Sequence, residues 1–344
     1  MHLQAVNPFD YADWNKRIES LGSSSFFNSI EWARVLSESY GYEPCYVVGI
    51  EGERFVSLLP LMHISSWLTG KRGVALPFSD NCEIIGLNQT VEENVLKFLK
   101  ALGQQKKWRS FEVRNGKCFD PSVPSASTYY YHALDLTLGV EALFGQIEGT
   151  VRTAIRKAVK NGVEVAISAT LESVRLFYHM HCETRRRHGL PPQPFAFFKN
   201  LYQHVLSNGM GFVGIARHQG VAIAASIFCH FEGHAVFKYG ASDLRLQEYR
   251  GSTMVMWEAI QWYVQQGYKH LSLGRTLETN SGLRRFKLGW GACETRIHYV
   301  KYDLRHQQFI SCAKDSVESG FGVVKIMPLF LNRLAGNILY RHMG

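Results

Sequence analysis

The sequence predicts an α+β protein in which one α+β unit occurs twice in tandem, followed by a short helical tail. Residues 46–63 and 212–230 each begin with an aromatic residue before a Val-Gly-Ile run, and each passes through a polar turn into an apolar strand. Residues 96–114 match 257–275, where a helical apolar spacing precedes a strand that ends on arginine. These two features are separated by 66 residues in the first copy and by 62 in the second. A repeat of this length indicates duplicated domains rather than a solenoid.

We expect the first domain at residues 1–135, the second at 136–305 and the helical tail at 306–344. Each copy begins with a β-hairpin, and a glycine lies in each predicted turn, Gly52 in the first and Gly220 in the second. An amphipathic helix follows in each copy. Its apolar face consists of Leu96, Leu99 and Leu102 in the first copy and of Trp257, Ile260 and Tyr263 in the second.

The segment between the copies begins as a loop at 115–129 and continues as a strand at 130–139. A helix follows that Asn161-Gly162 ends, and its apolar stripe has a spacing of four. The stripe consists of Leu143, Ile147, Val151, Ile155 and Val159. A strand at 163–168 and two helices, at 171–189 and 195–207, then lead to the second copy.

Composition excludes several classes of protein. The 344 residues are 46% hydrophobic and 19% charged, which excludes a disordered chain. The net charge of +9 favours an anionic partner, such as a phosphate, a nucleotide, CoA, tRNA or an acidic lipid surface, without choosing among them. The seven cysteines contain no CxxC pair, which favours reduced thiols in the cytoplasm. We expect neither a signal peptide nor a membrane-spanning helix.

Two basic clusters are candidates for binding an anion. Arg152, Arg156 and Lys160 share one helix face, which could contact a phosphate or simply be solvated. Arg186 lies in the basic run 185–188 near the end of a helix, where the helix dipole by itself also favours cations.

Two segments near the second helix are further candidates. The run 251–253, Gly-Ser-Thr, lies where the helix begins, so its backbone could hold an anion or its hydroxyls could cap the helix. The segment 272–292 combines four glycines with arginine and lysine, and it can form an anion cradle. The sequence contains no P-loop, dinucleotide-binding, GxSxG or HExxH motif, and we expect no bound metal.

Three strings together resemble FemAB-type transferases of the GNAT-like acyltransferase superfamily: VRTAIRKAVKNGVEV, TRRRHGLPPQP and LSLGRT…SGLRRFKLGWGA. Within that family, the chain is most similar to the subgroup associated with PEP-CTERM and exosortase systems. The resemblance covers about residues 26–305 and extends to the tail. It implies two fused GNAT-like domains, each with a mixed central sheet flanked by helices, and a cleft where the domains meet.

The resemblance also implies roles for individual residues. Arg152 and Arg156 would meet phosphates of the acceptor, Lys287 would lie near the transferred acyl group, and Asp80 would lie in a loop that reaches the cleft. Further substrate contacts are expected from Arg186, His188, Tyr239 and Arg275.

The reaction implied is N-acyl transfer, in which an amine attacks a thioester or ester carbonyl directly. Lys287 or a backbone N–H would stabilise the oxyanion, and the proton would pass to Asp80 or to a phosphate of the acceptor. The resemblance implies acyl-CoA or aminoacyl-tRNA as the co-substrate, and we expect no permanently bound cofactor. In 247–252, QEYRGS, the glycine is displaced from the Q/R-x-x-G-x-G/A pattern of GNAT proteins that bind acetyl-CoA, so the donor stays open.

The expected acceptor is an amine of a small molecule, saccharide or peptide related to the cell envelope or an exopolysaccharide. We expect the protein in the cytoplasm, including the inner face of the membrane, which the helical tail could contact. The alternative is a non-catalytic double-GNAT protein that binds an anionic lipid, a saccharide or tRNA.

Overall fold

The computed structural model describes the chain except for residues 23–24, 83, 87–88, 115–121 and 312–321. Part of the loop predicted at 115–129 and part of the predicted tail therefore lie outside the described residues. The described chain forms two compact units, called unit 1 and unit 2 below. Unit 1 comprises residues 1–131, 295–317 and 339–344, and unit 2 comprises 132–294 and 318–338. The domain ranges expected from the sequence were continuous and stay a prediction.

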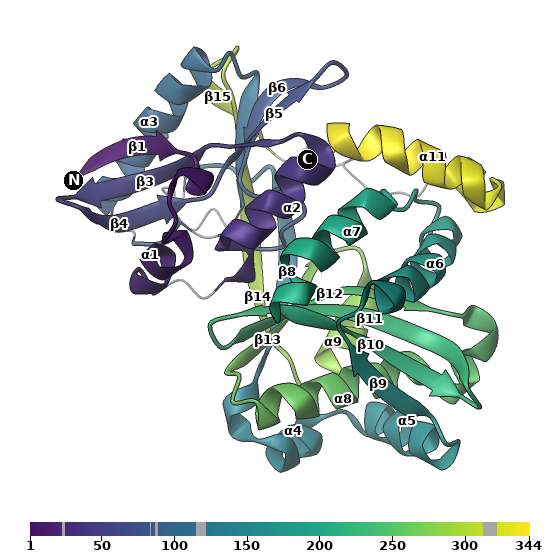
Figure 1. Cartoon of the computed structure of the whole chain (residues 1–344). Helices are drawn as coiled ribbons and strands as arrows, with labels where there is room; N and C mark the ends of the chain where they lie inside the picture. The colour runs from purple at the N-terminus through teal and green to yellow at the C-terminus, as the bar shows by residue number, and fades with distance from the viewer. Residues whose placement is uncertain (23–24, 83, 87–88, 115–121, 312–321) are drawn as a thin grey trace. The chain divides into compact units, whose positions relative to one another are not determined.

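Unit 1 begins with a strand and two helices, and the strand belongs to a small antiparallel sheet (Figure 1). This sheet has the order β1-β3-β4. Its elements and the helices before it are β1 (His2–Val6), α1 (Trp14–Ser20), α2 (Ile30–Tyr40), β3 (Tyr46–Glu51) and β4 (Arg54–Leu59), with short 3-10 helices at Pro8–Asp10 and Phe26–Asn28.

A second sheet in unit 1 has the order β2-β5-β6-β7-β14-β8. The strand β8 continues into unit 2, and β14 enters unit 1 from unit 2. The elements are β2 (Glu43–Pro44), β5 (Met62–Ser66), β6 (Gly70–Val74), α3 (Gln89–Gln105), β7 (Ser110–Arg114), β8 (Ser127–Asp135), β14 (Cys293–Asp303) and β15 (Gln308–Phe309), and a 3-10 helix at Tyr340–His342 belongs to the same unit.

Unit 2 contains the second predicted copy and the helices before it (Figure 1). The elements are α4 (Val140–Gln146), α5 (Gly149–Lys160), β9 (Glu164–Ser168), α6 (Leu171–Arg187), α7 (Phe195–His204), β10 (Gly211–His218), β11 (Val221–Phe231), β12 (His234–Ser242), α8 (Gly251–Gln265), β13 (His270–Leu277), α9 (Ser281–Leu288), α10 (Gly322–Ile326) and α11 (Leu329–Leu339), with 3-10 helices at Leu136–Leu138, Leu206–Asn208 and Leu244–Tyr249.

The sheet of unit 2 has the order β8-β13-β12-β11-β10-β9. The pair β12–β13 is parallel, whereas β9 to β12 are joined by antiparallel pairs. Helices α5 and α8 cover one face of this sheet, and α6 and α7 cover the other (Figure 1). The strand β11 is consequently buried along most of its length. This mixed sheet flanked by helices confirms the predicted fold class.

Both predicted hairpins are present. Gly52 and Gly220 lie in the turns and have φ angles of 60° and 79°, in the left-handed region that glycine adopts without strain. Each copy then continues as a strand, a helix and a parallel strand. The pair β6–β7 in unit 1 and the pair β12–β13 in unit 2 each have three residue couples in register. The duplication read from the sequence is thus a repeated β-α-β arrangement.

The copies differ at Pro60. In unit 2, β11 is one strand of 11 residues, whereas its counterpart in unit 1 is divided at Pro60 into β4 and β5. Proline has no N–H to donate to a neighbouring strand, so the ladder ends there. The chain then changes sheets, because β4 pairs with β3 and β5 pairs with β6.

The helix predicted from the apolar stripe is two helices, α4 and α5, separated at Ile147 and Glu148. The prediction that Val159 belongs to the buried face is also wrong, since Val159 is 59% exposed and Ala158 is fully buried in its place. Residues four apart advance 40° beyond a full helical turn, so a long spacing of four rotates off the buried face. The core therefore takes Ala158, three residues after Ile155.

The start of α8 is shaped by packing rather than by a side-chain cap. Arg250 precedes the helix in the left-handed conformation, and neither Ser252 nor Thr253 caps it with its side chain. A Cβ on Gly251 would meet Ile223 of β11 at 2.7 Å. A residue without a side chain is therefore required where the helix touches the sheet.

Candidate functional site

The centre of the candidate site in unit 2 is the place where β12 and β13 diverge. The two strands pair only from His234–His270 to Val236–Ser272, although both continue for five or more residues. Beyond the last couple, each strand has an edge with backbone N–H and C=O groups that are not paired with the other strand. Such edges can accept an extended, amide-bearing ligand between them.

Lys287 of α9 lies against β13 just beyond the last paired couple. Its Nζ donates hydrogen bonds to the carbonyl oxygens of Gly274 (2.9 Å) and Arg275 (2.8 Å), and the residue is only 3% exposed. Gly274 has a φ angle of 73°, so only a glycine accepts this backbone conformation without strain. The arrangement holds an ammonium group at the edge of β13, and it brings two predicted residues, Lys287 and Arg275, into contact.

A partly buried ion-pair cluster fixes α9 against the strands. The guanidinium of Arg284 donates two hydrogen bonds of 2.7 Å to Glu294, and the Glu294 carboxylate contacts His132 Nε2 at 3.0 Å. Burial lowers the pKa of His132, and the charge of Lys287 lowers it further, so the imidazole is neutral near pH 7. The hydrogen bond from Arg284 lowers the pKa of Glu294. Sequence reasoning missed this cluster because its members lie up to 162 residues apart.

A relay of two hydrogen bonds orients Tyr239 on β12. His181 of α6 donates from Nε2 to Gln193 Oε1 at 3.1 Å, and Gln193 Nε2 donates to the Tyr239 hydroxyl at 3.0 Å. Burial lowers the pKa of His181 to about 3, so its ring is neutral. Tyr239 also contacts the ring of Phe198, 5.5 Å between centroids. The relay holds Tyr239 toward the helices α6 and α7.

The carboxyl end of β12 opens into a cavity of about 720 Å³ that we call the arginine cavity. Its cationic lining residues are Arg186, Arg187, Arg245 and Lys325, with His179 beside them. Two carboxylates are also present, and each contacts one arginine: Glu183 contacts Arg186 at 2.8 Å and Asp243 contacts Arg245 at 2.7 Å. Cations therefore outnumber carboxylates, which suits an anionic group.

The other predicted residues of unit 2 lie elsewhere in that unit. His188 follows α6 and is exposed. Arg152 on α5 donates to the carbonyl oxygen of Gly145 at 3.2 Å, and Arg156 lies over the ring of Phe144 at 5.8 Å. Neither of these two arginines lines the arginine cavity. Their predicted contact with phosphates of the acceptor stays a prediction.

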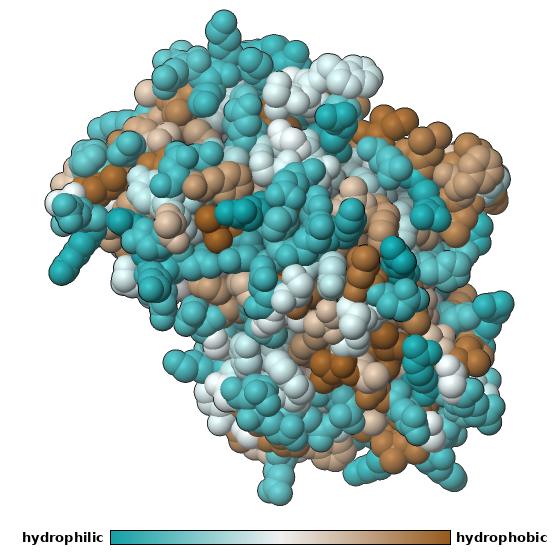
Figure 2. Space-filling model, in the orientation of Figure 1, coloured by the Kyte–Doolittle hydropathy of each residue, from teal (hydrophilic) through white to brown (hydrophobic). Residues whose placement is uncertain are grey.

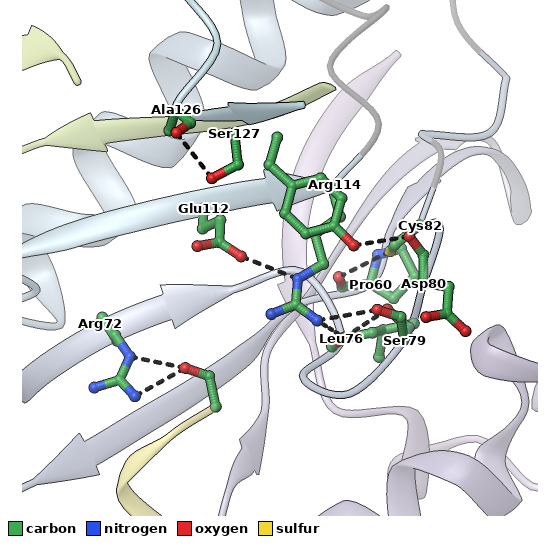
Figure 3. A network of polar contacts seen from close by, with 12 residues as sticks. Pro60, Arg72, Leu76, Ser79, Asp80, Cys82, Glu112, Arg114, Ala126 and Ser127 are labelled. Atoms are coloured by element: carbon green, nitrogen blue, oxygen red, sulfur yellow. Dashed lines mark hydrogen bonds and ion pairs between the residues drawn. The ribbon is translucent and has the colours of Figure 1, made fainter. Parts of the chain in front are cut away.

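Asp80 lies in unit 1, in the loop that follows β6 (Figure 3). Two features give this loop a fixed shape. The guanidinium of Arg114 donates to the carbonyl oxygens of Leu76 (3.1 Å) and Ser79 (3.2 Å), and the Tyr299 hydroxyl donates to the Asp80 carbonyl oxygen at 2.7 Å.

The backbone of the same loop is strained. Leu76 and Phe78 have φ angles of 38° and 61°, which cost energy in residues other than glycine. Arg114 is 8% exposed, and its Nε also contacts Glu112 at 3.0 Å. This buried network keeps the loop in its strained conformation, and it was not predictable from the motif LPFSDN alone.

Unit 1 also has a cavity of about 610 Å³ with a basic lining. The lining includes Lys71, Lys107, Arg109 and Arg305 beside Trp67, a residue that is 82% exposed. No carboxylate is among the described residues that line this cavity. Within the described chain, no cluster of three His, Cys, Asp or Glu residues is arranged to hold a metal ion.

Comparison with known protein families gives a match within unit 2. Residues 147–292 match the family described as acetyltransferase (GNAT) domain, and this range lies entirely within unit 2. No curated protein sequence matches the chain at a significant level.

Solved structures show the same fold over most of the chain. The crystal structure of FemX has a TM-score of 0.70 at 12% identity and covers 89% of this chain and 98% of its own. The C-terminal domain of a putative lysylphosphatidylglycerol synthetase from Agrobacterium fabrum has a TM-score of 0.54 at 14% identity, covering 83% and 90%. A tandem GNAT protein from the clavulanic acid biosynthesis pathway, determined without AcCoA, has a TM-score of 0.50 at 10% identity, covering 88% and 98%. The predicted GNAT-like duplication is confirmed, whereas the PEP-CTERM subgroup stays a prediction.

Proposed function

We propose that the protein is an N-acyltransferase that moves an acyl or aminoacyl group onto an amine of its acceptor by direct attack. The observation that carries the proposal is the divergence of β12 and β13, with the Lys287 ammonium held at the edge of β13. The match of residues 147–292 to the acetyltransferase (GNAT) domain supports the reaction class. The reacting carbonyl would lie between the two diverging strands.

In the proposed reaction, the amine nitrogen attacks the carbonyl carbon of the donor. A C–N bond forms, and the C–S bond of a thioester or the C–O bond of an ester breaks. The amine loses a proton, and the leaving thiolate or alkoxide gains one. Holding the two reactants in position contributes about 7–11 kcal/mol to such reactions. The chain needs no covalent nucleophile for this sequence of steps.

We assign Lys287 to the stabilisation of the oxyanion. A buried cation acts strongly on a developing negative charge because little water is present to screen it. Arg284, Glu294 and His132 fix α9, from which Lys287 extends, so the position of the ammonium is set before the substrate binds. Asp80 is the base that we assign to the amine proton, and a phosphate of the acceptor is the rival base.

The arginine cavity supports an anionic substrate group at the carboxyl end of β12. We assign Arg186 to this contact, and we place Tyr239 and Arg275 at the diverging strands. Arg152, Arg156 and His188 are the further positions where we propose substrate contacts. The donor is acyl-CoA or aminoacyl-tRNA, and both carry phosphate groups that such cations bind.

For the acceptor, we propose an amine of a cell-envelope or exopolysaccharide-related molecule, modified on the cytoplasmic side. Two neighbours in fold have names that fit this chemistry. One is a putative lysylphosphatidylglycerol synthetase, and the name of the other mentions AcCoA. Both names describe those proteins, and they support a group-transfer reaction here only by likeness of fold.

Calorimetric titration of the full chain at low salt, with acyl-CoAs of rising chain length, tests the donor. Saturable micromolar binding that strengthens with chain length, followed by transfer to an amine, would establish the acyl-CoA reaction. Transfer from charged tRNA, with no heat of binding for any acyl-CoA, would establish the aminoacyl reaction. Binding of an anionic lipid or saccharide without transfer from either donor would contradict the proposed transferase activity and would favour a non-catalytic binding protein.

A further inference from the structure

The helices α10 and α11 in unit 2 present a row of apolar side chains to solvent. The row consists of Val323, Ile326, Phe330, Leu334 and Ile338, and we call it the tail face. Their exposed fractions lie between 52% and 85%. The spacing of three residues within α10, and of four residues within α11, places these side chains along one side of each helix. Figure 2 shows the corresponding hydrophobic surface over α11.

The opposite side of α11 is already packed on unit 2. Asn332 is fully buried, and Gly336 is buried where a Cβ would overlap the carbonyl oxygen of Pro192. The guanidinium of Arg333 lies 5.1 Å from the ring centroid of Tyr178 on α6. Because these contacts fix the rotation of the helix, the tail face cannot turn inward to cover its own apolar residues.

The charged side chains on the two helices themselves are all basic. Residues 322–338 contain Lys325 and Arg333 but no Asp or Glu. A cavity of about 310 Å³ lies beside α11, and Arg175, His179 and Arg333 supply its charged and titratable lining. No carboxylate is among the described residues that line this cavity. An apolar row next to the arginines of this cavity is the pattern of a helix that lies in an anionic membrane interface.

We propose that the tail face binds the surface of an anionic phospholipid bilayer, with its apolar side chains in the interface. The cavity lined by Arg175 and Arg333 takes a phosphate of a lipid headgroup. The helices would lie in the plane of the membrane surface. No helix among the described residues is long and apolar enough to span a bilayer. The proposal does not depend on the transfer reaction proposed above, although Lys325 and His179 also line the arginine cavity.

Vesicle sedimentation with the full chain tests the proposal. Vesicles of phosphatidylcholine alone are compared with vesicles that also contain phosphatidylglycerol. The key variant is Ile326→Glu with Phe330→Glu, whose wild-type side chains are 85% and 68% exposed, so the fold does not depend on them. We expect binding to the anionic vesicles to fall at least about tenfold in this variant, since two large apolar side chains leave the interface.

The matched control is Leu138→Glu with Val159→Glu, which adds the same charge at exposed apolar residues of unit 2 outside the tail face. This control should bind the anionic vesicles as the wild type does. Arg175→Gln with Arg333→Gln should weaken that binding by about fivefold for each arginine. Inorganic phosphate at millimolar concentration should not displace the protein, because free phosphate lacks the apolar part of the ligand.

Several results would overturn the proposal. Equal binding to neutral and anionic vesicles would show that the cations do not contribute to binding. Unchanged binding by the Ile326 and Phe330 variant would show that the tail face is not the binding surface. Absence of vesicle binding, together with a dimer in light scattering that this variant dissociates, would make a second copy of the chain the occupant. Unchanged far-ultraviolet circular dichroism of each variant ensures that the results report on the surface rather than on folding.

Discussion

At the scale of single residues, the position of Lys287 shows what a motif can and cannot predict. The Gly/Arg/Lys-rich string 272–292 indicated this lysine as a candidate. It did not predict the hydrogen bonds of the lysine to the carbonyl oxygens of Gly274 and Arg275. Those bonds depend on a left-handed glycine and on the packing of α9, which arise from contacts across the fold. Motifs indicate which residue types are present, whereas burial and partners come from tertiary structure.

Lys287→Ala should lower kcat by about 100-fold or more and change KM much less, because the lost charge acts mainly on the transition state. Steady-state kinetics with the donor identified by titration measures both constants. Since the residue is buried, Lys287→Met, which retains most of the side-chain volume, accompanies it as a folding control. Unchanged turnover in a folded variant would exclude Lys287 from the mechanism.

His181 should make the stability of the protein depend on pH. Its pKa is lowered to about 3 in the folded protein, and the ordinary value near 6.5 applies to the unfolded chain. Below pH 6.5 the unfolded chain therefore binds a proton that the folded chain does not bind. The free energy of unfolding should fall by about 1.4 kcal/mol per pH unit as the pH decreases from 6.5 toward 3.

Denaturant titrations at pH 7 and pH 5 measure this effect in the wild type and in His181→Gln, which cannot titrate. The variant should lose about 2 kcal/mol less than the wild type over this range. The comparison isolates His181 from the other buried histidines, whose pKa values burial also lowers, such as His132 and His230. Parallel curves for the two proteins would show that His181 is not held neutral by burial.

At the scale of elements, the sequence predicted the type of element better than its ends. The hairpins, the strand at β9 and the helices α6, α7 and α8 are present as expected. The division between α4 and α5 was missed, because an apolar spacing of four continues through Ile147 without marking the break. The change of sheet at Pro60 was also missed, since it depends on which strands pair and not on strand propensity.

The contact of α8 with β11 should be sensitive to one methyl group. Gly251→Ala places a Cβ at 2.7 Å from Ile223 Cγ1 and 3.2 Å from Ala224 Cβ, so the helix must move away from the sheet. We expect the free energy of unfolding to fall by about 1–3 kcal/mol. Chemical denaturation of the full chain measures this change.

Gly145→Ala in α4 is the matched control. A Cβ at that position meets no atom within 4 Å, so alanine should be neutral or should stabilise the protein by up to about 1 kcal/mol through its higher helix propensity. A loss of stability of the same size in both variants would show that the close packing at Gly251 is not the cause.

At the scale of the whole molecule, binding that uses the overall charge of +9 and binding at a local basic surface should differ in their dependence on salt concentration. A donor bound mainly in the arginine cavity contacts only a few cations, so its affinity should fall by about tenfold between 50 and 200 mM salt. An RNA that follows many basic residues would lose about 1,000-fold or more over the same range. We expect the smaller change for the donor that supports transfer, and titrations at three salt concentrations measure it.

The duplication itself was predictable from sequence, because the two copies retain matching hairpins, helices and strands at nearly equal separations. The composition of the units was not predictable. Unit 1 combines the first 131 residues with 295–317 and 339–344, and these segments are far apart in the chain. Strand pairing between distant segments leaves no periodic signal in either segment alone.

This discontinuity has a consequence for how the protein is made on the ribosome. The strand β14 pairs with β7 over five residue couples, from Arg114–Tyr299 to Ser110–Asp303. When residue 131 leaves the exit tunnel, the sheet of unit 1 still lacks this strand, and about 160 more residues must be translated before it emerges. At 5–20 residues per second, that delay is roughly 10–30 s. Unit 1 therefore waits with an open sheet edge, exposed to chaperones, while residues 132–294 of unit 2 are still being synthesised.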